Sequence, residues 1–326
     1  MSKKNKNKKR HPKSYIFLIG IIVPIIFLLA AIFLFFSNSP SSLANIYVSS
    51  ENPKQGDTVF IKVKTSAKDV AGNFNNEKLN FYKKANSNQW ISFLGIDADQ
   101  NVGNYKISVD TSNAEHLTKD IKVALASFSS QAVAPAPAKN QNGISNEKAV
   151  DNIRKNDNPS LNKILENPTA KPYFSNPFSS PLSSMKIGGF GFGKFLGFGK
   201  YKLQHLGVDL TAPDKTDIYA VNDGKVVATL NLSNYGKTVI IDHGLDIFSL
   251  YLHLDKFSVL PGEMVKRGQL IGLSGETGYT TGPHLHFSMR VDGERVDPLA
   301  FIQTTQDLND NSFIASISNA FQNIFK

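Results

Sequence analysis

Alternating apolar and polar residues recur through residues 46–127, and this pattern restricts the fold class of that region more than any other feature. The stretch DTVFIKVKTS places Val59, Ile61 and Val63 on one face, with Phe60 and two lysines on the other. Successive side chains of a β-strand point to opposite faces, so this period of two predicts a strand. GNYKISVDT and DIKVALAS repeat the pattern between turn signals such as NPKQGD. Residues 46–127 are therefore predicted to form a small immunoglobulin-like β-sandwich.

Residues 179–302 are predicted to form a second β-rich unit. KVVATL, KTVIIDHG, FSLYLHL, QLIGLSG and LHFSMRV are short runs rich in Val, Ile, Leu and Phe, bounded by Gly, Asp, Asn and Pro. Almost nothing in this region has a helical period, so we expect an antiparallel β-sandwich and a mainly β chain. Residues 128–178 contain an Ala-Pro stretch and are interpreted as a linker with short helices. Residues 303–326 have apolar side chains at helical spacing and are interpreted as a helical tail.

The first 36 residues indicate attachment to a membrane. Residues 1–14 contain six Lys, one Arg and no acid, and residues 15–36 form an uncharged apolar run of 22 residues. At about 1.5 Å per residue a helix of this length spans roughly 33 Å, enough to cross a bilayer core. The basic flank predicts a cytoplasmic tail, with everything after residue 36 outside the membrane. A cleaved signal peptide is the alternative, but its apolar region is at most about 15 residues long, so we favour an uncleaved anchor.

Composition excludes several kinds of chemistry. The chain has no cysteine, which rules out disulfides, thiolate metal sites and cysteine nucleophiles. Its formal net charge is +9, and residues 1–14 carry seven of these charges. The basic character therefore belongs mainly to the tail, and we expect no nucleic-acid partner.

Histidines concentrate in one quarter of the chain. Five of the seven lie between residues 205 and 286. His205 and Asp209 are four residues apart, a spacing that puts both on one face of a strand or a helix. The stretch TTGPHLHFSMRV places His284 and His286 two residues apart at the start of a predicted strand, so these two also share a face. An isolated His-x-His pair most often consists of half-exposed surface residues, but here it has companions.

This histidine cluster suits a zinc site. Catalytic zinc commonly takes three nitrogen or oxygen ligands from the protein and leaves a fourth position to water, whose pKa falls to about 7. His205, Asp209 and either histidine of the pair make such a set. The other histidine of the pair and His253 are then available to transfer a proton and to polarise a carbonyl. His243 has no role in this scheme.

Other catalytic motifs fit less well. The chain has no His-Glu-x-x-His and no Gly-x-Ser-x-Gly, and GLSGETG is better interpreted as a turn before a strand. The stretch GGFGFGKFLGFG, residues 188–199, has the wrong spacing for a dinucleotide loop. We interpret it as a flexible loop beside the metal site that borders the substrate groove.

Three stretches together resemble a known family. HLGVDLTAP, VIIDHGLDIFSLYLHLDKFSVLPGEMVKRGQLIGLSGETGYTTGPHLHF and the closing VDPLAFI are similar to the lysostaphin-like, LytM-type zinc metallopeptidases that act on bacterial peptidoglycan. The resemblance covers residues 179–302. It implies a groove-bearing β fold that cleaves peptide bonds in the cell wall. It also implies that His205, Asp209 and His286 hold Zn²⁺, and that His253 and His284 are catalytic histidines outside the ligand set.

Two features depart from the family pattern. Lys215 stands where members often have glycine, so that turn is expected to differ. Members often have a catalytic tyrosine upstream of the first ligand, and Tyr201 is the nearest candidate, but its spacing does not assign it that role. Neither departure removes a ligand.

The sequence therefore predicts a membrane-anchored zinc endopeptidase with its catalytic domain outside the cytoplasm and peptidoglycan as its substrate. The alternative is a zinc-bearing regulator that activates other wall hydrolases without cutting. A purely structural tether would leave the histidine cluster without a role. D,D-cross-links, glycine bridges and stem amides all suit zinc chemistry, so the shape of the groove selects the bond that is cut. The β-sandwich and the linker are separate candidates for covering the site.

Overall fold

A computed structural model describes residues 44–84, 86–132, 145–198 and 201–310. The predicted cytoplasmic tail (1–14) and the predicted membrane anchor (15–36) lie outside the described residues, as do residues 311–326 of the predicted helical tail. Within the described ranges, no helix combines the length and the apolar character that a membrane span requires.

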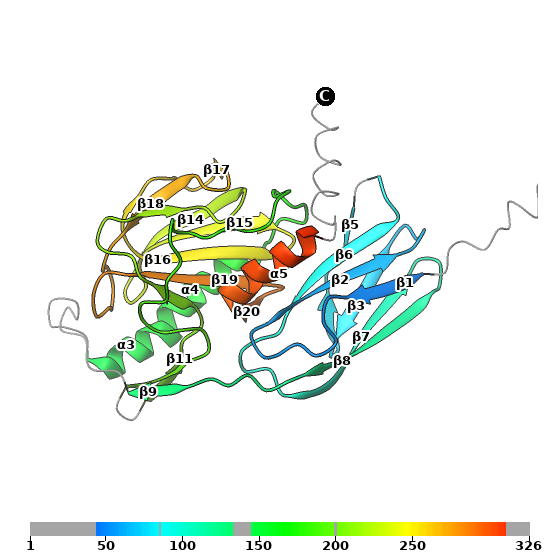
Figure 1. Ribbon diagram of the computed structural model, residues 1–326, viewed down its shortest axis with the longest axis horizontal. Coiled ribbons are helices and arrows are strands. Elements are labelled where there is room, and N and C mark those ends of the chain that lie inside the picture. The colour runs from blue at the N-terminus through cyan, green and yellow to red at the C-terminus, as the bar shows by residue number, and fades with distance from the viewer. Residues whose placement is uncertain (1–43, 85, 133–144, 199–200, 311–326) are drawn as a thin grey trace, which may run out of the picture. The chain divides into compact units, whose positions relative to one another are not determined.

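The first eight strands form two four-stranded antiparallel sheets, coloured blue to green-cyan in Figure 1. One sheet has the order β1-β2-β6-β5 and the other β4-β3-β7-β8. Apolar side chains from both sheets form one buried cluster, which includes Val59, Ile61 and Val63 as the alternation predicts. The strands are β1 (Asn45–Val48), β2 (Thr58–Lys64), β3 (Val70–Phe74), β4 (Glu77–Leu79), β5 (Tyr82–Lys83), β6 (Gln89–Gly95), β7 (Gly103–Thr111) and β8 (His116–Val123).

A nine-stranded antiparallel sheet dominates the second half of the chain. Its main path is β12-β19-β16-β15-β14-β17; β13 and β18 pair with each other, β18 also pairs with β16, and β20 pairs with β19. The first eight residues of β16 are all buried, which places this strand at the centre of the sheet. The predicted mainly antiparallel β fold is thus confirmed. The strands are β12 (Val208–Leu210), β13 (Asp217–Tyr219), β14 (Gly224–Leu232), β15 (Gly236–Gly244), β16 (Ile247–Phe257), β17 (Met264–Val265), β18 (Leu270–Ser274), β19 (Leu285–Val291) and β20 (Glu294–Val296).

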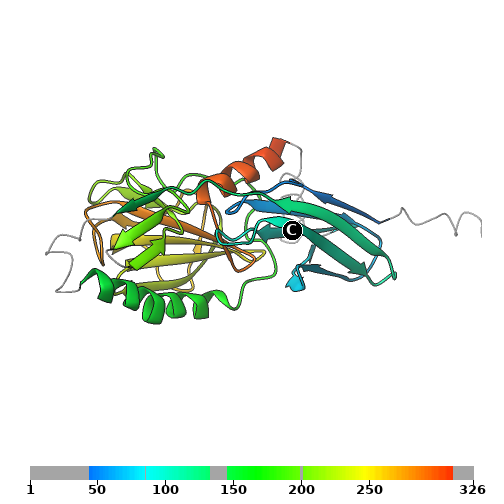
Figure 2. The ribbon, with the colours of Figure 1, turned by 90° about the horizontal axis from the view of Figure 1, so that it is seen from below.

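The segment interpreted as a linker takes part in the packing of this sheet from residue 145 onward, and its residues 133–144 lie outside the described residues. Helices α3 (Asn146–Asn152), η1 (Ile153–Asp157) and α4 (Asn158–Leu165) follow one another without a break and run along one face of the sheet (Figure 2). Leu161 of α4 is buried in a cluster with leucines and a phenylalanine of β16. The sequence pattern missed this packing because only one side of a short, polar helix contributes to it.

Downstream of these helices, the chain enters the main core. Phe174 and Phe178 are buried and pack edge to face against each other, with ring centroids 5.1 Å apart. Phe178 also packs against Phe301 of helix α5 (Pro298–Asp310). An irregular segment has no period, so its two buried phenylalanines gave no signal of a folded element.

The first two sheets and the nine-stranded sheet are joined by a shared core. Phe60 and Phe93 belong to the same buried cluster as Phe301. Beside them, the Arg295 guanidinium donates to both carboxylate oxygens of Asp97, at 2.9 and 3.2 Å. The predicted sandwich is therefore in direct contact with the region that carries the histidines.

Candidate metal centre and active site

Two strands and one loop bring the predicted metal ligands together. His205 lies in the loop between β11 (Tyr201–Gln204) and β12, Asp209 lies on β12, and His286 lies on β19. Asp209 and His286 stand directly opposite each other in the antiparallel pair of β12 and β19. One ligand atom from each residue lies within 4.8 Å of the other two. The structure thus assembles the ligand set that the family resemblance implied.

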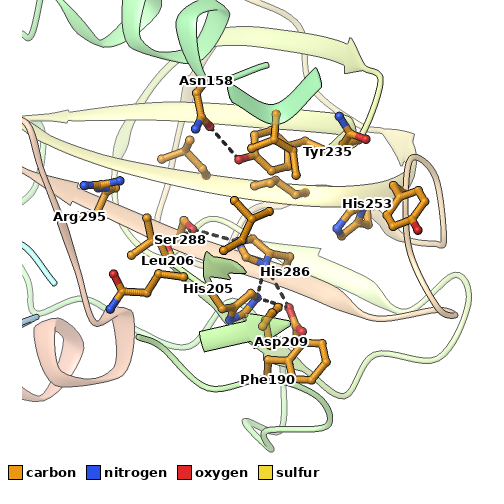
Figure 3. Close-up of a pocket in the computed structure, with 18 of the residues that line it drawn as sticks. Asn158, Phe190, His205, Leu206, Asp209, Tyr235, His253, His286, Ser288 and Arg295 are labelled. Carbon is orange, nitrogen blue, oxygen red and sulfur yellow. Dashed lines mark hydrogen bonds and ion pairs between the residues drawn. The ribbon is translucent and has the colours of Figure 1, made fainter. Parts of the chain in front are cut away.

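The ligand atoms are closely spaced. Nε2 of His205 lies 2.9 Å from Nδ1 of His286, and Oδ1 of Asp209 lies 3.1 and 3.0 Å from these two nitrogens (Figure 3). Zinc bonds of about 2.0–2.1 Å in a tetrahedron place ligand atoms about 3.3 Å apart. The observed triangle is close to that size.

Hydrogen bonds on the far side of each ring set the tautomers. Nδ1 of His205 lies 3.1 Å from the carbonyl oxygen of Gly191, which only accepts, so this nitrogen carries the proton. Nε2 of His286 lies 3.1 Å from the Ser288 hydroxyl, which itself donates to the Leu206 carbonyl and therefore accepts from the ring. In each neutral ring the other nitrogen then has a lone pair, and both lone pairs face the Asp209 carboxylate.

Three electron-pair donors that meet without a proton between them require a cation. Burial lowers the pKa of His286 to about 4, which keeps its ring neutral and ready to bind metal. Burial acts to raise the pKa of Asp209, but the neighbouring His205 and His286 outweigh it and hold that pKa well below its usual range. Two neutral imidazoles and one carboxylate fit Zn²⁺, and the Ser288 and Gly191 contacts are the outer hydrogen bonds that orient such ligands.

The glycine-rich stretch 188–199 contributes to the centre. The backbone N–H of Phe190 donates to Oδ2 of Asp209 at 3.1 Å, which leaves Oδ1 for the metal. The Phe190 ring packs edge-on to His205, with centroids 5.8 Å apart. Part of this predicted loop is strand β10 (Phe195–Phe198), paired with β11 and with β9 (Ser130–Ala132). The stretch borders the cavity as expected, but it is more ordered than a flexible loop.

The two predicted catalytic histidines lie beside the ligands. The ring centroid of His253 is 4.9 Å from that of His284 and 6.1 Å from that of His286. Nδ1 of His253 lies 2.8 Å from the Thr277 carbonyl, and Nδ1 of His284 lies 2.8 Å from the Gly282 carbonyl. Both rings therefore carry their proton on Nδ1 and have a lone pair on Nε2 when neutral. Burial, followed by the neighbouring His284 and His286, lowers the pKa of His253 to about 3.

A backbone irregularity orients His253. Its φ angle is +61°, a left-handed conformation that is uncommon for residues other than glycine. The register of β16 against β15 shifts across His253, between Tyr251 and Leu254, and its register against β18 shifts just beyond, between Leu254 and Lys256. β-Bulges of this kind redirect a side chain and recur beside active sites.

A cavity of about 460 Å³ opens onto the metal ligands. His205, Asp209, His253, His284 and His286 all line it. From the ligands it extends past Ser288 toward Tyr235, Asn158 and Arg295 (Figure 3). Residues of α4 and η1 complete its wall, so the predicted linker helps to shape the groove.

The structure also places three other residues that the sequence singled out, and one that it missed. His243 lies outside the site, where its nitrogens contact the Asp223 carbonyl and the Ser249 hydroxyl within the core. Lys215, the departure from the family glycine, adopts φ +62°, so the turn keeps a left-handed residue. Tyr201, to which the sequence assigned no role, is the first residue of β11. Sequence reasoning missed Ser288, although its position two residues after His286 puts it on the same strand face.

Comparisons with known proteins agree with this geometry. Residues 203–298 match peptidase family M23. The chain is 46% identical over 95 residues to peptidoglycan DD-endopeptidase ShyA of Vibrio cholerae, a match that covers 29% of this chain and 22% of ShyA. It is 34% identical over 160 residues to glycyl-glycine endopeptidase ALE-1 of Staphylococcus capitis, covering 45% of this chain and 42% of ALE-1. The chain thus spans less than half the length of these curated relatives.

A solved structure extends the likeness beyond the matched segment. A candidate peptidase M23 from Pseudomonas aeruginosa aligns with 77% of this chain and 95% of its own, with a TM-score of 0.54 and 24% sequence identity. At that identity the likeness concerns the fold alone. The family match and the His-Asp-His centre identify residues 203–298 as a peptidase M23 domain of the LytM type.

Proposed function

We propose that this protein is a membrane-anchored zinc metalloendopeptidase that hydrolyses peptide bonds in peptidoglycan stems or cross-links. The observation that carries the proposal is the convergence of two fixed lone pairs and a carboxylate on one point at the end of a cavity. The names of the relatives, a DD-endopeptidase and a glycyl-glycine endopeptidase, support peptidoglycan as the substrate class.

The chain's own residues fulfil the remaining requirements of peptide hydrolysis. When bound, zinc supplies a water of lowered pKa and a Lewis acid for the scissile carbonyl. In their neutral forms the His253 and His284 rings each have a lone pair on Nε2, and both residues line the cavity beside the ligands, so one accepts a proton from the attacking water. Once protonated, the same nitrogen donates to the leaving amine or to the developing oxyanion. The carbonyls of Thr277 and Gly282 hold both rings in the required orientation.

The decisive experiment measures cleavage and metal content together. The purified full-length protein is incubated with isolated sacculi, and new amino termini are counted with and without a chelator. We expect zinc-dependent release of amino termini, loss of release after chelation and recovery when Zn²⁺ is added. Zinc-loaded protein that releases none would favour the regulator, and undiminished release after chelation would exclude the zinc mechanism.

The anchor needs its own test because the segment lies outside the described residues. The proposal rests on the basic flank of residues 1–14 and the uncharged run of residues 15–36. We expect the protein to stay in the membrane fraction through high-salt and carbonate washes, with residues 45–326 accessible from outside. A mature soluble form that begins near Asn45 would instead identify a cleaved signal peptide.

A further inference from the structure

A buried carboxylate fastens the helical segment 146–165 to a turn of the nine-stranded sheet. Asp157, the last residue of η1, is only 2% exposed. Its Oδ2 accepts from the backbone N–H of Asn234 at 2.8 Å and from the Asn234 side-chain amide at 3.1 Å. The next residue, Asn158, accepts from the Tyr235 hydroxyl at 2.8 Å (Figure 3). Asp157 stands at the N-cap position of α4 but makes no capping bond to that helix, so its carboxylate serves the turn instead.

The turn at residues 233–235 joins β14 to β15 and contacts the main chain of the active site. The Tyr235 carbonyl accepts from the backbone N–H of His253 at 3.0 Å. The Asn234 carbonyl accepts from the backbone N–H of Tyr279, in the loop that precedes β19, at 2.9 Å. The two turn residues that the helical segment binds are thus also the two that hold the active-site backbone.

The same turn packs against the residue that orients the His253 ring. The Thr277 carbonyl accepts from Nδ1 of His253, and the Thr277 hydroxyl accepts from the backbone N–H of Lys237 at 2.9 Å. A Cβ at Gly236 would lie 2.3 Å from the Thr277 carbonyl oxygen, so no space separates the end of the turn from Thr277. A displacement of the turn therefore displaces the acceptor of the ring N–H of His253 as well as that of its backbone N–H.

His253 depends on this support more than an ordinary strand residue does. Its φ angle of +61° belongs to a sparsely populated conformation, which persists only where the surroundings hold it. A group that transfers a proton must lie within hydrogen-bond reach of its partner, and a misplacement of about 1 Å can cost roughly 10²-fold in rate. Small movements of the turn therefore have large consequences for catalysis.

We propose that Asp157 is a positioning residue for the peptidase reaction. Its carboxylate fixes the turn at residues 233–235, and through this turn it holds His253 in the orientation that proton transfer requires. The proposal rests on the proposed function and deepens it, because it makes the helical segment 146–165 part of the catalytic unit. The simpler alternative is that Asp157 only fastens this segment to the sheet.

Asp242 provides a matched control. It is also a carboxylate that is 2% exposed, and it accepts from the backbone N–H groups of Thr169 at 3.0 Å and of Gly244 at 2.7 Å. It thus fastens another residue of the predicted linker to β15. Its cross-strand partner Phe248 is five residues from His253 along β16, roughly 17 Å away. Asp242→Ala should therefore remove a comparable attachment without moving His253.

The first test separates kcat from KM. The full-length, zinc-loaded variants are assayed on a soluble fragment of cross-linked peptidoglycan, and their zinc content is measured. Asp157→Ala should retain zinc and a KM within about threefold of wild type but lose roughly 10- to 100-fold in kcat. Asp242→Ala should keep kcat within about threefold of wild type. An Asp157→Ala variant with wild-type kcat, or an equal loss in Asp242→Ala, would overturn the proposal.

A double-mutant cycle identifies the residue through which Asp157 acts. In the slow His253→Ala background, adding Asp157→Ala should cost no more than about twofold, because the group that it positions is gone. The same loss in both backgrounds would show that Asp157 acts on folding or on another group. Asp157→Asn keeps an acceptor oxygen for both N–H groups of Asn234 and should recover most of kcat. An asparagine variant as slow as the alanine variant would contradict positioning through these hydrogen bonds.

A spectroscopic measurement distinguishes failure of this proposal from failure of the proposed function. In full-length protein labelled with ¹⁵N-histidine, NMR reports which ring nitrogen carries the proton. His253 should be a single Nδ1–H tautomer in wild type and in Asp242→Ala, and a mixture of tautomers in Asp157→Ala. If the wild type cuts no substrate, the proposed function fails, but this mixture would still support the positioning role.

Unchanged His253 signals in a folded Asp157→Ala variant would exclude the positioning role, whether or not the wild type is active. Thermal unfolding identifies a variant that is misfolded. If Asp157→Ala is misfolded, Asp157→Ser takes its place, because its shorter side chain withdraws the acceptor and stays polar. The same two outcomes, a mixture of tautomers or a single one, then decide the proposal.

Discussion

Two histidines two residues apart, one just before β19 and one within it, use their Nδ1 atoms differently, and this difference assigns their roles. Nδ1 of His286 faces His205 and Asp209, whereas Nδ1 of His284 is occupied by the Gly282 carbonyl. His286 is therefore in a position to bind metal through the nitrogen that His284 uses for orientation. The histidine spacing alone could not distinguish these two roles, because it fixes the face but not the ring rotation.

We therefore expect opposite outcomes from the two substitutions. His286→Ala leaves one imidazole and one carboxylate, so zinc affinity should collapse. His284→Ala should keep near-stoichiometric zinc but lose roughly 10²- to 10⁴-fold in kcat, the usual range for a positioned acid–base group. Metal analysis of the purified variants beside their cleavage rates checks both. Zinc that is lost from His284→Ala and kept by His286→Ala would reverse the assignment.

Gly207 provides a second residue-scale prediction. A Cβ at this position would lie 2.5 Å from Nε2 of His286 and 2.5 Å from the Ser288 hydroxyl, inside their hydrogen bond. Gly207→Ala should therefore displace the ring and weaken zinc binding by about 10- to 100-fold, as expected for loss of an outer partner of a ligand. Competition with a coloured chelator measures the affinity. Gly191→Ala is the matched control, because a Cβ there meets no atom within 4 Å and the carbonyl that orients His205 is retained.

At the scale of elements, the tip of the β19–β20 hairpin contains a carboxyl in an unfavourable place. Asp292 has φ +53°, and its backbone N–H donates to the carbonyl of Asp246 in the neighbouring turn. Burial, followed by the charges of Asp246 and Glu77, raises the pKa of Asp292 to about 7. Between pH 4 and 7 the folded protein holds a proton here that the unfolded chain releases, so the free energy of unfolding falls as pH rises through this window.

Asp292→Asn should remove that dependence. Asparagine tolerates the left-handed conformation and carries no charge, so we expect the variant to be more stable than wild type by about 1–2 kcal/mol at pH 8. Below pH 4 the two proteins should be equally stable. Urea unfolding across this pH range measures the difference, with the exposed Asp214→Asn as the control that should follow wild type. A stability gain that is equal at pH 4 and pH 8 would contradict a titrating Asp292.

The elements also show where sequence reasoning reached its limit. The strands of the nine-stranded sheet were predictable, because short apolar runs between turn residues are local signals. The His-x-x-x-Asp and His-x-His spacings located the candidate ligands, but the family resemblance was needed to assign His286 rather than His284 to the metal. The packing of Leu161 and the burial of Phe174 were not predictable, because both depend on partners far along the chain. Phe60 gave a signal that was not used: an aromatic residue that shares the outer face of a strand with two lysines points to a second buried surface.

At the scale of the whole molecule, that second surface joins the two β regions. Phe60 and Phe93 pack at a centroid distance of 5.3 Å, and Phe93 packs against Phe301 at 6.4 Å. The buried Asp97 carboxylate binds Arg295 next to this cluster. A shared core of this kind transmits unfolding from one region to the other.

We therefore expect a single calorimetric transition for the two β regions in the wild-type protein. Phe93→Ala removes a buried ring at the junction, at a cost of about 3–5 kcal/mol, and should separate the melting of the first eight strands from that of the nine-stranded sheet. Differential scanning calorimetry measures both, and the ratio of calorimetric to van't Hoff enthalpy reports cooperativity. Two separate transitions in the wild type would show that the regions unfold independently.

The central position of β19, between β12 and β16, has a consequence for the timing of biosynthesis. The first ligand residue, His205, is synthesised 81 residues before His286, and Asp209 gains its strand partner only when β19 is inserted. A growing chain that ends before residue 286 therefore presents an open gap where the third ligand belongs. We therefore expect zinc capture, and with it the proposed activity, to follow the synthesis of residue 286.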